Sequence, residues 1–580
     1  MKFEIRNNFY LDGKPFHIIS GAIHYFRIVP QYWRDRLEKL KAMGCNTVET
    51  YIPWNMHEPR KGEFCFDGML DVVEFVQTAQ KLGLYVILRP SPYICAEWEF
   101  GGLPAWLLAE DGMRLRVSYK PFLRHVKEYY EVLMKKIVPL QVDYGGPVIL
   151  MQVENEYGYY ANDKKYMETI KKMMIEQGVT VPLITSDGPF EENLNGGILE
   201  GTLPTGNFGS KTEERFEVLQ KYTKEKPLMC AEFWVGWFDH WGNGGHMAGN
   251  LEESVKDLDK MLELGHVNIY MFEGGTNFGF MNGSNYYDAL TPDVTSYDYD
   301  GVLTEDGQIT EKYRRYQKVI AKYREIPEVK FTTDIKRKEY GKILVEEKVS
   351  LYSVLNEIST PVESIYPQSM ECLGQNYGYI FYHTTLDTEE CVEKVRLWGA
   401  NDRANIFIGQ KPAGVFYDLE LLEEHELNEK LGENRSFDVL VENMGRVNFG
   451  PRMELQRKGI SQCVQINGHM HNGWKQYRLP LDDVTKIDFT KEYKEGLPAF
   501  YRFCFEVDEI ADTFLDFAGW GKGCAFVNGF NIGRYWEIGP QKRLYIPAPL
   551  LIKGKNEIIL FETEGKAEKY ITLKDTPDIG

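Results

Sequence analysis

Two acidic residues stand at the ends of short apolar segments in the first half of the chain. Glu156 comes shortly after the apolar run 148–153, and Glu232 directly follows the run 227–231. In a chain that alternates strands and helices, a carboxylate just past a strand lies where a parallel barrel builds its active site. Breaking a glycosidic bond needs such a pair, because one acid protonates the leaving oxygen while an anionic group meets the oxocarbenium-like centre. The two residues therefore indicate glycosidase chemistry.

A third acid, Glu154, lies next to the same strand end. Glu154 and Glu156 are two residues apart and would share a strand face if the strand continued that far. Asn155 between them could donate its amide to a sugar hydroxyl. The alternative for each of the three acids is a buried ion-pair network at the mouth of the barrel.

The elements that must position these acids alternate regularly from residue 17 to about residue 323. Apolar runs predict eight strands at 18–22, 46–51, 85–89, 148–152, 183–186, 198–201, 229–233 and 268–272. Apolar residues at helical spacing predict helices between them, among others at 31–43, 70–82, 121–137, 164–176 and 251–264. Eight strands, each leading into a helix, are typical of a (β/α)8 barrel, also called a TIM barrel.

Beyond residue 326 the pattern changes to short alternating strands with Gly, Asn and Pro turns, which favours β-sandwich or jelly-roll domains. A faint repeat supports two related domains: residues 407–416 align with 526–535 at an offset of 119, and 439–442 align with 559–562 at 120. A chance match between Gly-punctuated strands is the alternative. We predict a barrel over 1–326, a β-sandwich over 327–470 and a jelly roll over 471–580.

Composition narrows the class of partner. A net charge of -19 and a pI near 5.2 argue against nucleic acid and anionic membranes, which need clustered Lys and Arg, and favour a neutral small ligand. Aromatic residues make up 14% of the chain, more than packing requires, and such rings stack on sugars. Phosphate-binding loops and paired metal-ligand spacings are absent from the sequence, so we expect no cofactor and no metal.

The sequence also carries expectations about location. The first residues include Glu4 and Asp12 and no apolar stretch of adequate length for export, and no 18-residue apolar run follows. Nine scattered cysteines are typical of reduced thiols. We therefore expect a cytoplasmic protein.

Long motifs in the barrel resemble those of the glycoside hydrolase family 35 β-galactosidases. The segments QVENEYG (152–158) and AEFWVGW (231–237) resemble the acid/base and nucleophile motifs of that family. Four further segments stand in the same order as in the family: TYIPWNMHEP (50–59), RPSPYICAEWEFGGLPAWL (89–107), GGTNF (274–278) and TSYDYD (295–300). Residues 520–546 resemble the family's C-terminal galactose-binding-like jelly roll.

The resemblance implies roles for individual residues. Glu156 would be the acid/base, Glu232 the nucleophile, and Asn155 would meet the 2-hydroxyl of the sugar. It also implies a galactose pocket, with Tyr297 nearby, made of Tyr51, Cys95, Ala96, Glu97, Tyr270 and Tyr299. Three tryptophans follow the nucleophile, and we expect at least one to floor the subsite of the leaving sugar: Trp234, Trp237 and Trp241.

The implied activity is that of a retaining exo-β-galactosidase that removes terminal β-galactose from short oligosaccharides. The short form resembles bacterial members that favour β-1,3 linkages. The alternatives are an exo-β-glucosaminidase or another β-glycosidase on the same scaffold, and a sugar-binding protein without catalysis. Because added β domains often serve as interfaces, a homodimer is the expected assembly.

Overall fold

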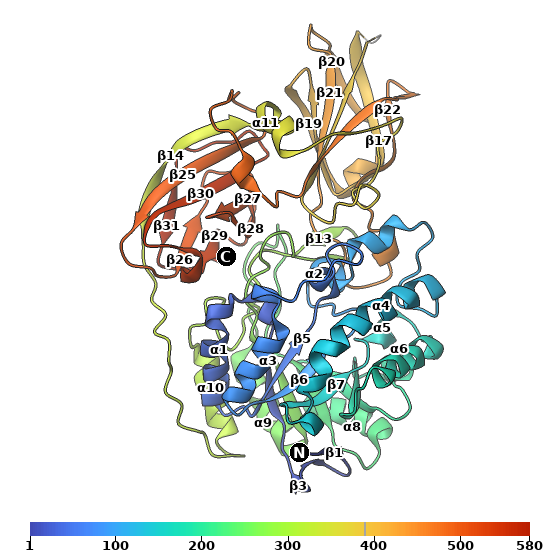
Figure 1. Cartoon of the computed structure of the whole chain (residues 1–580), viewed down its shortest axis with the longest axis vertical. Helices are drawn as coiled ribbons and strands as arrows, with labels where there is room; N and C mark the ends of the chain where they lie inside the picture. Colours follow the sequence, from blue (N-terminus) through green and yellow to red (C-terminus); the bar gives the residue numbers. More distant parts are fainter. Residues whose placement is uncertain (388–389) are drawn as a thin grey trace.

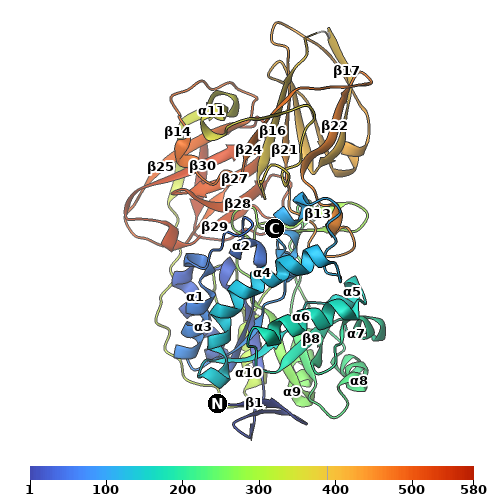
Figure 2. The ribbon, with the colours of Figure 1, turned by 45° about the vertical axis from the view of Figure 1, so that its right-hand side comes forward.

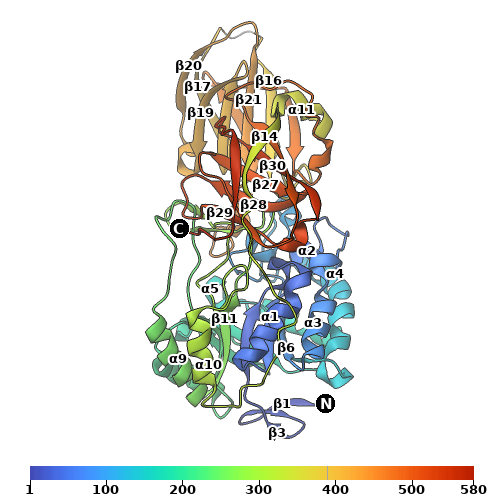
Figure 3. The same ribbon diagram turned by 90° about the vertical axis from the view of Figure 1, so that its left-hand side faces the viewer.

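The chain folds into a barrel with two β domains stacked on one of its ends. The computed structural model describes residues 1–387 and 390–580. Figures 1 and 3 show the barrel and its helices in the lower half of the molecule and the β domains in the upper half, while a small N-terminal sheet of β1 (Phe3–Ile5), β2 (Phe9–Leu11) and β3 (Lys14–Pro15) lies at the opposite end.

Eight parallel strands close the barrel in the order β10-β11-β4-β5-β6-β7-β8-β9. Their residues are almost entirely buried, which explains why the strands appear in the sequence as apolar runs rather than alternating patterns. The fold class predicted from the sequence is confirmed. In chain order the strands are β4 (Ile19–Ile23), β5 (Thr47–Tyr51), β6 (Tyr85–Arg89), β7 (Val148–Gln152), β8 (Leu183–Asp187), β9 (Leu203–Asn207), β10 (Met229–Trp234) and β11 (His266–Glu273).

Helices surround this barrel and begin and end close to the predicted residues. Helix α1 (Pro30–Met43) begins with a proline and is followed by Gly44, whose φ of 109° is left-handed. The missing side chain of Gly44 leaves room for Ile320 and Ile326. The main helices are α1 (Pro30–Met43), α3 (Val72–Lys81), α4 (Lys120–Ile137), α6 (Lys164–Glu176), α8 (Thr212–Thr223), α9 (Leu251–Leu264) and α10 (Glu311–Ile320). Figure 2 shows α1, α3, α4 and α6 side by side on the outside of the barrel.

The sixth barrel strand is not where the sequence places it. Residues 198–201 connect helix α7 (Glu191–Gly197) to the strand, and the strand itself is β9, from Leu203 to Asn207. β9 contains Pro204 and Gly206, two residue types that disfavour strands. Closure of the barrel between β8 and β10 imposes the strand on a segment whose local preference is against it.

The β domains are discontinuous in sequence. After α10 the chain runs along the outside of the barrel and enters the far domain first, as β14 (Gly341–Ser350) (Figure 1). This strand pairs with β25 (Ala499–Val507) and β31 (Tyr570–Lys574) in an eight-stranded sheet. The other domain has a six-stranded and a four-stranded sheet, and its strand β24 (Trp474–Leu479) pairs with β16 (Tyr379–Thr385).

The predicted boundaries therefore need correction. Residues 341–350 belong with the C-terminal domain rather than with 327–470, and residues 474–479 belong with the first β domain rather than with 471–580. The cause is backbone pairing between strands about 150 residues apart, for example Val345 with Phe503, which a local change of pattern does not reveal.

The sequence repeat falls on equivalent hairpins of the two β domains. β18 (Arg403–Ile408) pairs with β19 (Lys411–Tyr417), and β27 (Lys522–Val527) pairs with β28 (Phe530–Trp536). Each hairpin has an irregularity in register at the corresponding place, between Ile406 and Phe407 and between Ala525 and Phe526. β21 (Ser436–Glu442) lies beside the first hairpin and β30 (Gly554–Glu562) beside the second.

Candidate active site

A cavity of about 260 Å³ lies at the C-terminal ends of the barrel strands, where it is bordered by both predicted catalytic acids. Its lining comes mainly from the segments that follow β6 and β7, from β10 and β11, from the loop around Tyr299 and, across the domain boundary, from Phe449 of the first β domain. Of the residues predicted for the site, it is lined by Cys95, Ala96, Glu97, Asn155, Glu156, Glu232, Trp234, Trp237, Tyr270 and Tyr299.

Glu232 lies within strand β10 and is surrounded by hydrogen-bond donors. Its Oε1 accepts a hydrogen bond of 2.5 Å from the Tyr51 hydroxyl and one of 2.7 Å from Arg89 Nη1, and its Oε2 accepts one of 3.1 Å from Trp234 Nε1. A guanidinium and two further donors stabilise the ionised carboxylate. This environment suits a group that reacts as an anion.

Glu156 is the second acid and has a different environment. It follows β7 in a left-handed backbone conformation, with φ of 45°, and its amide donates to the Ser186 carbonyl at 2.9 Å. Its Oε1 accepts a hydrogen bond of 3.0 Å from Asn207 Nδ2. Burial, followed by the negative charge of nearby Glu232, raises the pKa of Glu156 to about 7.

Asn155 is oriented by donors that all reach its side-chain oxygen. Oδ1 accepts from Arg89 Nη2 at 3.0 Å and from Gln152 Nε2 at 3.0 Å, and it lies 2.8 Å from the Tyr51 hydroxyl, whose one proton is closer to Glu232. Because the carbonyl side of the amide is occupied, the NH₂ group is the part left to meet a ligand in the cavity that Asn155 lines.

Glu154 belongs to a separate structural ion pair. Both of its oxygens accept from Arg116, at 3.1 and 2.9 Å, and Tyr166 donates to Oε1 at 2.7 Å. Strand β7 ends at Gln152 and Glu154 has φ of 57°, so the face that Glu154 and Glu156 would share on a continued strand does not exist. The ion-pair alternative is the correct one for Glu154.

The loop after β6 supplies one wall of the cavity. Cys95, Ala96 and Glu97 all have left-handed backbones, with φ of 58°, 59° and 48°. Glu97 Oε2 accepts a hydrogen bond of 2.5 Å from the Tyr297 hydroxyl. Burial first, and then the charge of Asp293, raise the pKa of Glu97 to about 8.

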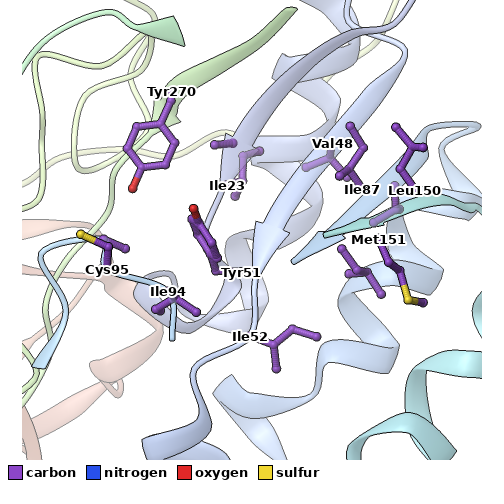
Figure 4. Packing of buried hydrophobic residues seen from close by; sticks show 14 of the residues in the cluster. Ile23, Val48, Tyr51, Ile52, Ile87, Ile94, Cys95, Leu150, Met151 and Tyr270 are labelled. Carbon is purple, nitrogen blue, oxygen red and sulfur yellow. The ribbon is translucent and has the colours of Figure 1, made fainter. Parts of the chain in front are cut away.

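The tyrosines divide between the cavity and the layer behind it. Figure 4 shows the hydroxyls of Tyr51 and Tyr270 pointing toward the same space, with Cys95 beside them and barrel residues such as Val48 and Ile87 farther away. Tyr270 and Tyr299 line the cavity, whereas Tyr297 is reached through its 3.1 Å contact with the Tyr270 hydroxyl. Tyr51 contacts Glu232 and Asn155 directly.

The tryptophans that follow Glu232 also have different positions. Trp234 and Trp237 line the cavity and meet edge to face with ring centroids 5.7 Å apart, and Trp237 is 38% exposed. Trp241 is buried, and its amide donates to the Pro292 carbonyl. Trp234 and Trp237 are thus the candidates for stacking on a leaving sugar.

Several site residues were missed by sequence reasoning. Arg89 ends strand β6, and an arginine at the end of an apolar run was a usable signal. Asn207 was missed because the sequence places the sixth strand at 198–201, whereas strand β9 ends at Asn207. Phe449 comes from a β domain and had no sequence signal, because it reaches the cavity only through domain packing.

Comparison with known proteins identifies the family of this chain. The sequence model of glycosyl hydrolases family 35 matches residues 8–323. The chain belongs to this family. Membership confirms the resemblance drawn from the barrel motifs and makes the chain a glycoside hydrolase. Two further models match the β domains of this family 35 member: the first all-beta domain of beta-galactosidase over 367–480 and the galactose-binding domain of beta-galactosidase over 498–556.

Relatives of this family 35 member match along nearly the whole chain. Beta-galactosidase-1-like protein 2 of Homo sapiens is 40% identical over 99% of this chain and 91% of its own length. A beta-galactosidase of Xanthomonas manihotis is 40% identical over 93% of this chain and 90% of its own length. Beta-galactosidase 17 of Arabidopsis thaliana is 37% identical over 97% of this chain and 87% of its own length.

The described residues lack two further kinds of feature. Within residues 1–387 and 390–580, no helix has the length and apolar character needed to cross a membrane. In the same part of the chain, no group of three or more His, Cys, Asp or Glu side chains is arranged to hold a metal ion.

Proposed function

We propose that this family 35 member is a retaining exo-β-galactosidase. The observation that carries the proposal is the pair Glu156 and Glu232, which border one small cavity in unequal environments. Glu232 is held by Arg89, Tyr51 and Trp234 in the form that attacks an anomeric carbon, while Glu156 has a pKa raised to about 7, as a general acid needs near neutral pH.

The two acids would act in two steps. Glu156 protonates the glycosidic oxygen as Glu232 attacks, which gives a covalent glycosyl-enzyme and releases the leaving sugar or alcohol. Glu156, now ionised, then takes a proton from water, and the resulting hydroxide displaces Glu232 so that the β configuration is restored. For this mechanism the two carboxyl groups must lie about 5 Å apart, close enough to exclude a water between them.

The size of the cavity supports removal of single terminal sugars. Its volume of about 260 Å³ lies just below the usual range of about 300–1,000 Å³ for ligand pockets. Glu97, Asn155 and Tyr270 offer polar groups toward a sugar in that space, and the names of the relatives point to galactose. A site built to pair one hydroxyl leaves its own groups unpaired when that hydroxyl is inverted, so discrimination against glucose of about 10³-fold or more is expected.

A set of aryl glycosides tests this proposal. Release of nitrophenol from β-galactoside, β-glucoside and β-N-acetylglucosaminide is compared at equal enzyme concentration. Comparable turnover of the glucoside and the galactoside would refute the assignment of the pocket to galactose, and faster turnover of a glucosaminide would favour the alternative glycosidase.

Proton NMR of the first-formed sugar tests the stereochemistry. Initial release of β-galactose is expected, whereas initial release of α-galactose means inversion and removes Glu232 from the nucleophile role. The preference for β-1,3 linkages is tested by assaying β-1,3, β-1,4 and β-1,6 galactosyl disaccharides side by side.

A further inference from the structure

The loop that carries Cys95, Ala96 and Glu97 has an unusual backbone. Besides these three residues, Phe100, Gly101 and Gly102 are also left-handed, with φ of 55°, 58° and 82°. Non-glycine residues keep this conformation only where the surrounding structure dictates it, and they cluster at ligand-binding sites. The contacts that hold the loop therefore bear directly on the shape of the sugar pocket.

Many of these contacts come from the first β domain. Its segment 444–448 lies directly against the loop: the amide of Phe100 donates to the Arg446 carbonyl at 3.4 Å, and the hydroxyl of Tyr93 donates to the Asn448 carbonyl at 2.6 Å. At Gly101 a Cβ would stand 2.3 Å from the Tyr93 ring and 3.0 Å from the Asn448 carbonyl oxygen. The loop and the β domain are therefore too close at this point for any side chain.

On its other side the loop is held by the barrel. The amide of Glu99 donates to the Met281 carbonyl at 2.8 Å, and the Glu97 carbonyl accepts from the amide of Gly283, also within 3 Å. The loop is thus clamped between residues 281–283 and residues 444–448.

Arg446 is the charged centre of the clamp. Its side chain is fully buried, and Nη1 donates to Glu99 Oε1 at 2.5 Å and to the Asn376 carbonyl at 2.6 Å. Nη2 donates to Glu371 of the β domain, and Nε donates to the Gln456 carbonyl at 3.1 Å. The rigid planar guanidinium therefore links the loop, through Glu99, to several fixed points of the β domain.

We propose that Arg446 is a positioning residue for catalysis: by holding Glu99 it keeps the preceding residues Cys95, Ala96 and Glu97 in the shape that receives the sugar. The proposal rests on the function proposed above. It assigns to the first β domain a direct part in substrate binding, beyond covering the barrel.

The test compares Arg446→Lys and Glu99→Gln with a matched control. Lysine keeps the charge but cannot reach Glu99, Glu371 and two carbonyls at once, and glutamine keeps the size of Glu99 without its charge. The control is Asp512→Asn, which weakens another buried carboxylate contact between barrel and β domain, from Tyr32 at 2.6 Å, and Asp512 contacts neither the loop nor the cavity. KM, kcat per active site and inhibition by the released monosaccharide are measured on the aryl β-glycoside that the wild type hydrolyses best.

We expect Arg446→Lys and Glu99→Gln, which we call the loop variants because both change the contact that holds the loop, to raise KM and weaken monosaccharide inhibition. Their kcat/KM should fall by up to about 100-fold, as for small misplacements of binding groups. Hydrogen exchange of the amides in 94–102 should become faster in both. Asp512→Asn should lower the thermal midpoint and leave KM, inhibition and exchange in the loop as in the wild type.

The proposal is overturned if the loop variants lose stability but keep the wild-type KM, inhibition constant and exchange. If Arg446→Lys fails to fold, Glu99→Gln decides by the same criteria. Failure of the wild type to favour β-galactosides would refute the proposed sugar specificity alone, because the comparison is made on whichever glycoside the wild type hydrolyses.

Discussion

Two regions of this molecule bury several charged side chains, and they do so in opposite ways. Where the two β domains meet, Lys522 Nζ lies 2.7 Å from both oxygens of Glu442, and Arg403 lies 2.7 Å from Glu564. We call these four residues the junction cluster. In the catalytic cavity the acids are unequally matched: Glu232 contacts Arg89, whereas Asn207 is the one side chain in the described part of the chain that donates to Glu156.

The difference separates a structural use of buried charge from a chemical one. A fully paired cluster holds each buried charge against its partner and so fixes how the domains meet. An acid that is buried beside a like charge and lacks a cation has its pKa moved toward the working pH. Glu154 shows the first behaviour and Glu156 the second, although they are two residues apart.

Replacing Glu232 should have the largest effect on turnover. Glu232→Gln keeps the shape and removes the nucleophile, so activity on every substrate should fall by more than the factor of about 10²–10⁴ that general acid–base catalysis contributes. Steady-state assays on aryl and natural galactosides measure this, with circular dichroism to confirm folding. Residual activity close to wild type on any substrate would contradict the nucleophile role.

Replacing Glu156 should be less damaging and should depend on the substrate. With Glu156→Ala, substrates with poor leaving groups lose about 10²–10⁴-fold, while nitrophenyl galactosides still undergo the first step because their leaving group needs little protonation. Azide should then restore turnover and yield β-galactosyl azide, detectable by NMR. Equal losses on both substrate types without azide rescue would remove Glu156 from the acid/base role.

Replacing Asn207 should change the pH dependence more than the maximum rate. Glu156 must start protonated, so kcat/KM should decline as the pH rises through about 7. The Asn207 hydrogen bond favours the ionised carboxylate and so holds the pKa of Glu156 down. In Asn207→Ala the alkaline limb of the profile of kcat/KM against pH should therefore move to higher pH by about one unit, since a hydrogen bond to a charged group contributes about 1.5 kcal/mol.

A control for this shift lies on the same strand. Thr205→Val removes a hydroxyl that donates to the Thr185 carbonyl and does not contact Glu156. Its kcat/KM profile should keep the alkaline limb of the wild type. A limb that moves equally in both variants would mean that strand β9, rather than the Asn207 hydrogen bond, sets the pKa.

Breaking the junction cluster should have the smallest effect on chemistry. Lys522→Met leaves the buried Glu442 without its closest cation, which costs about 3–5 kcal/mol of stability. The thermal midpoint should fall, while kcat/KM per active site stays at the wild-type value. If the double variant Lys522→Met/Glu442→Met regains part of the lost thermal midpoint, the cost comes from the unpaired charge. A changed KM in Lys522→Met would show that the junction cluster is coupled to the catalytic cavity.

Much of the barrel is visible in the sequence because its information is local. Strands buried on both faces appear as short apolar runs, and helices between them show apolar residues at helical spacing, so seven strands and the main helices fall close to their predicted positions. Glu156 and Glu232 were recognisable as candidate catalytic residues because each stands at or just past the end of a predicted strand. The repeat that marks the two β-domain hairpins was visible for the same reason.

Tertiary structure alone decided the features that depend on distant parts of the chain. Strand β9 forms against the preference of Pro204 and Gly206 because β8 and β10 leave a gap that only a strand closes, and Asn207 reaches Glu156 as a result. Val345 pairs with Phe503, and Arg446 meets Glu99 across 347 residues. Local sequence thus determined which segments form strands and carry acids, whereas the packing of remote segments determined which acid is paired and which is left free to react.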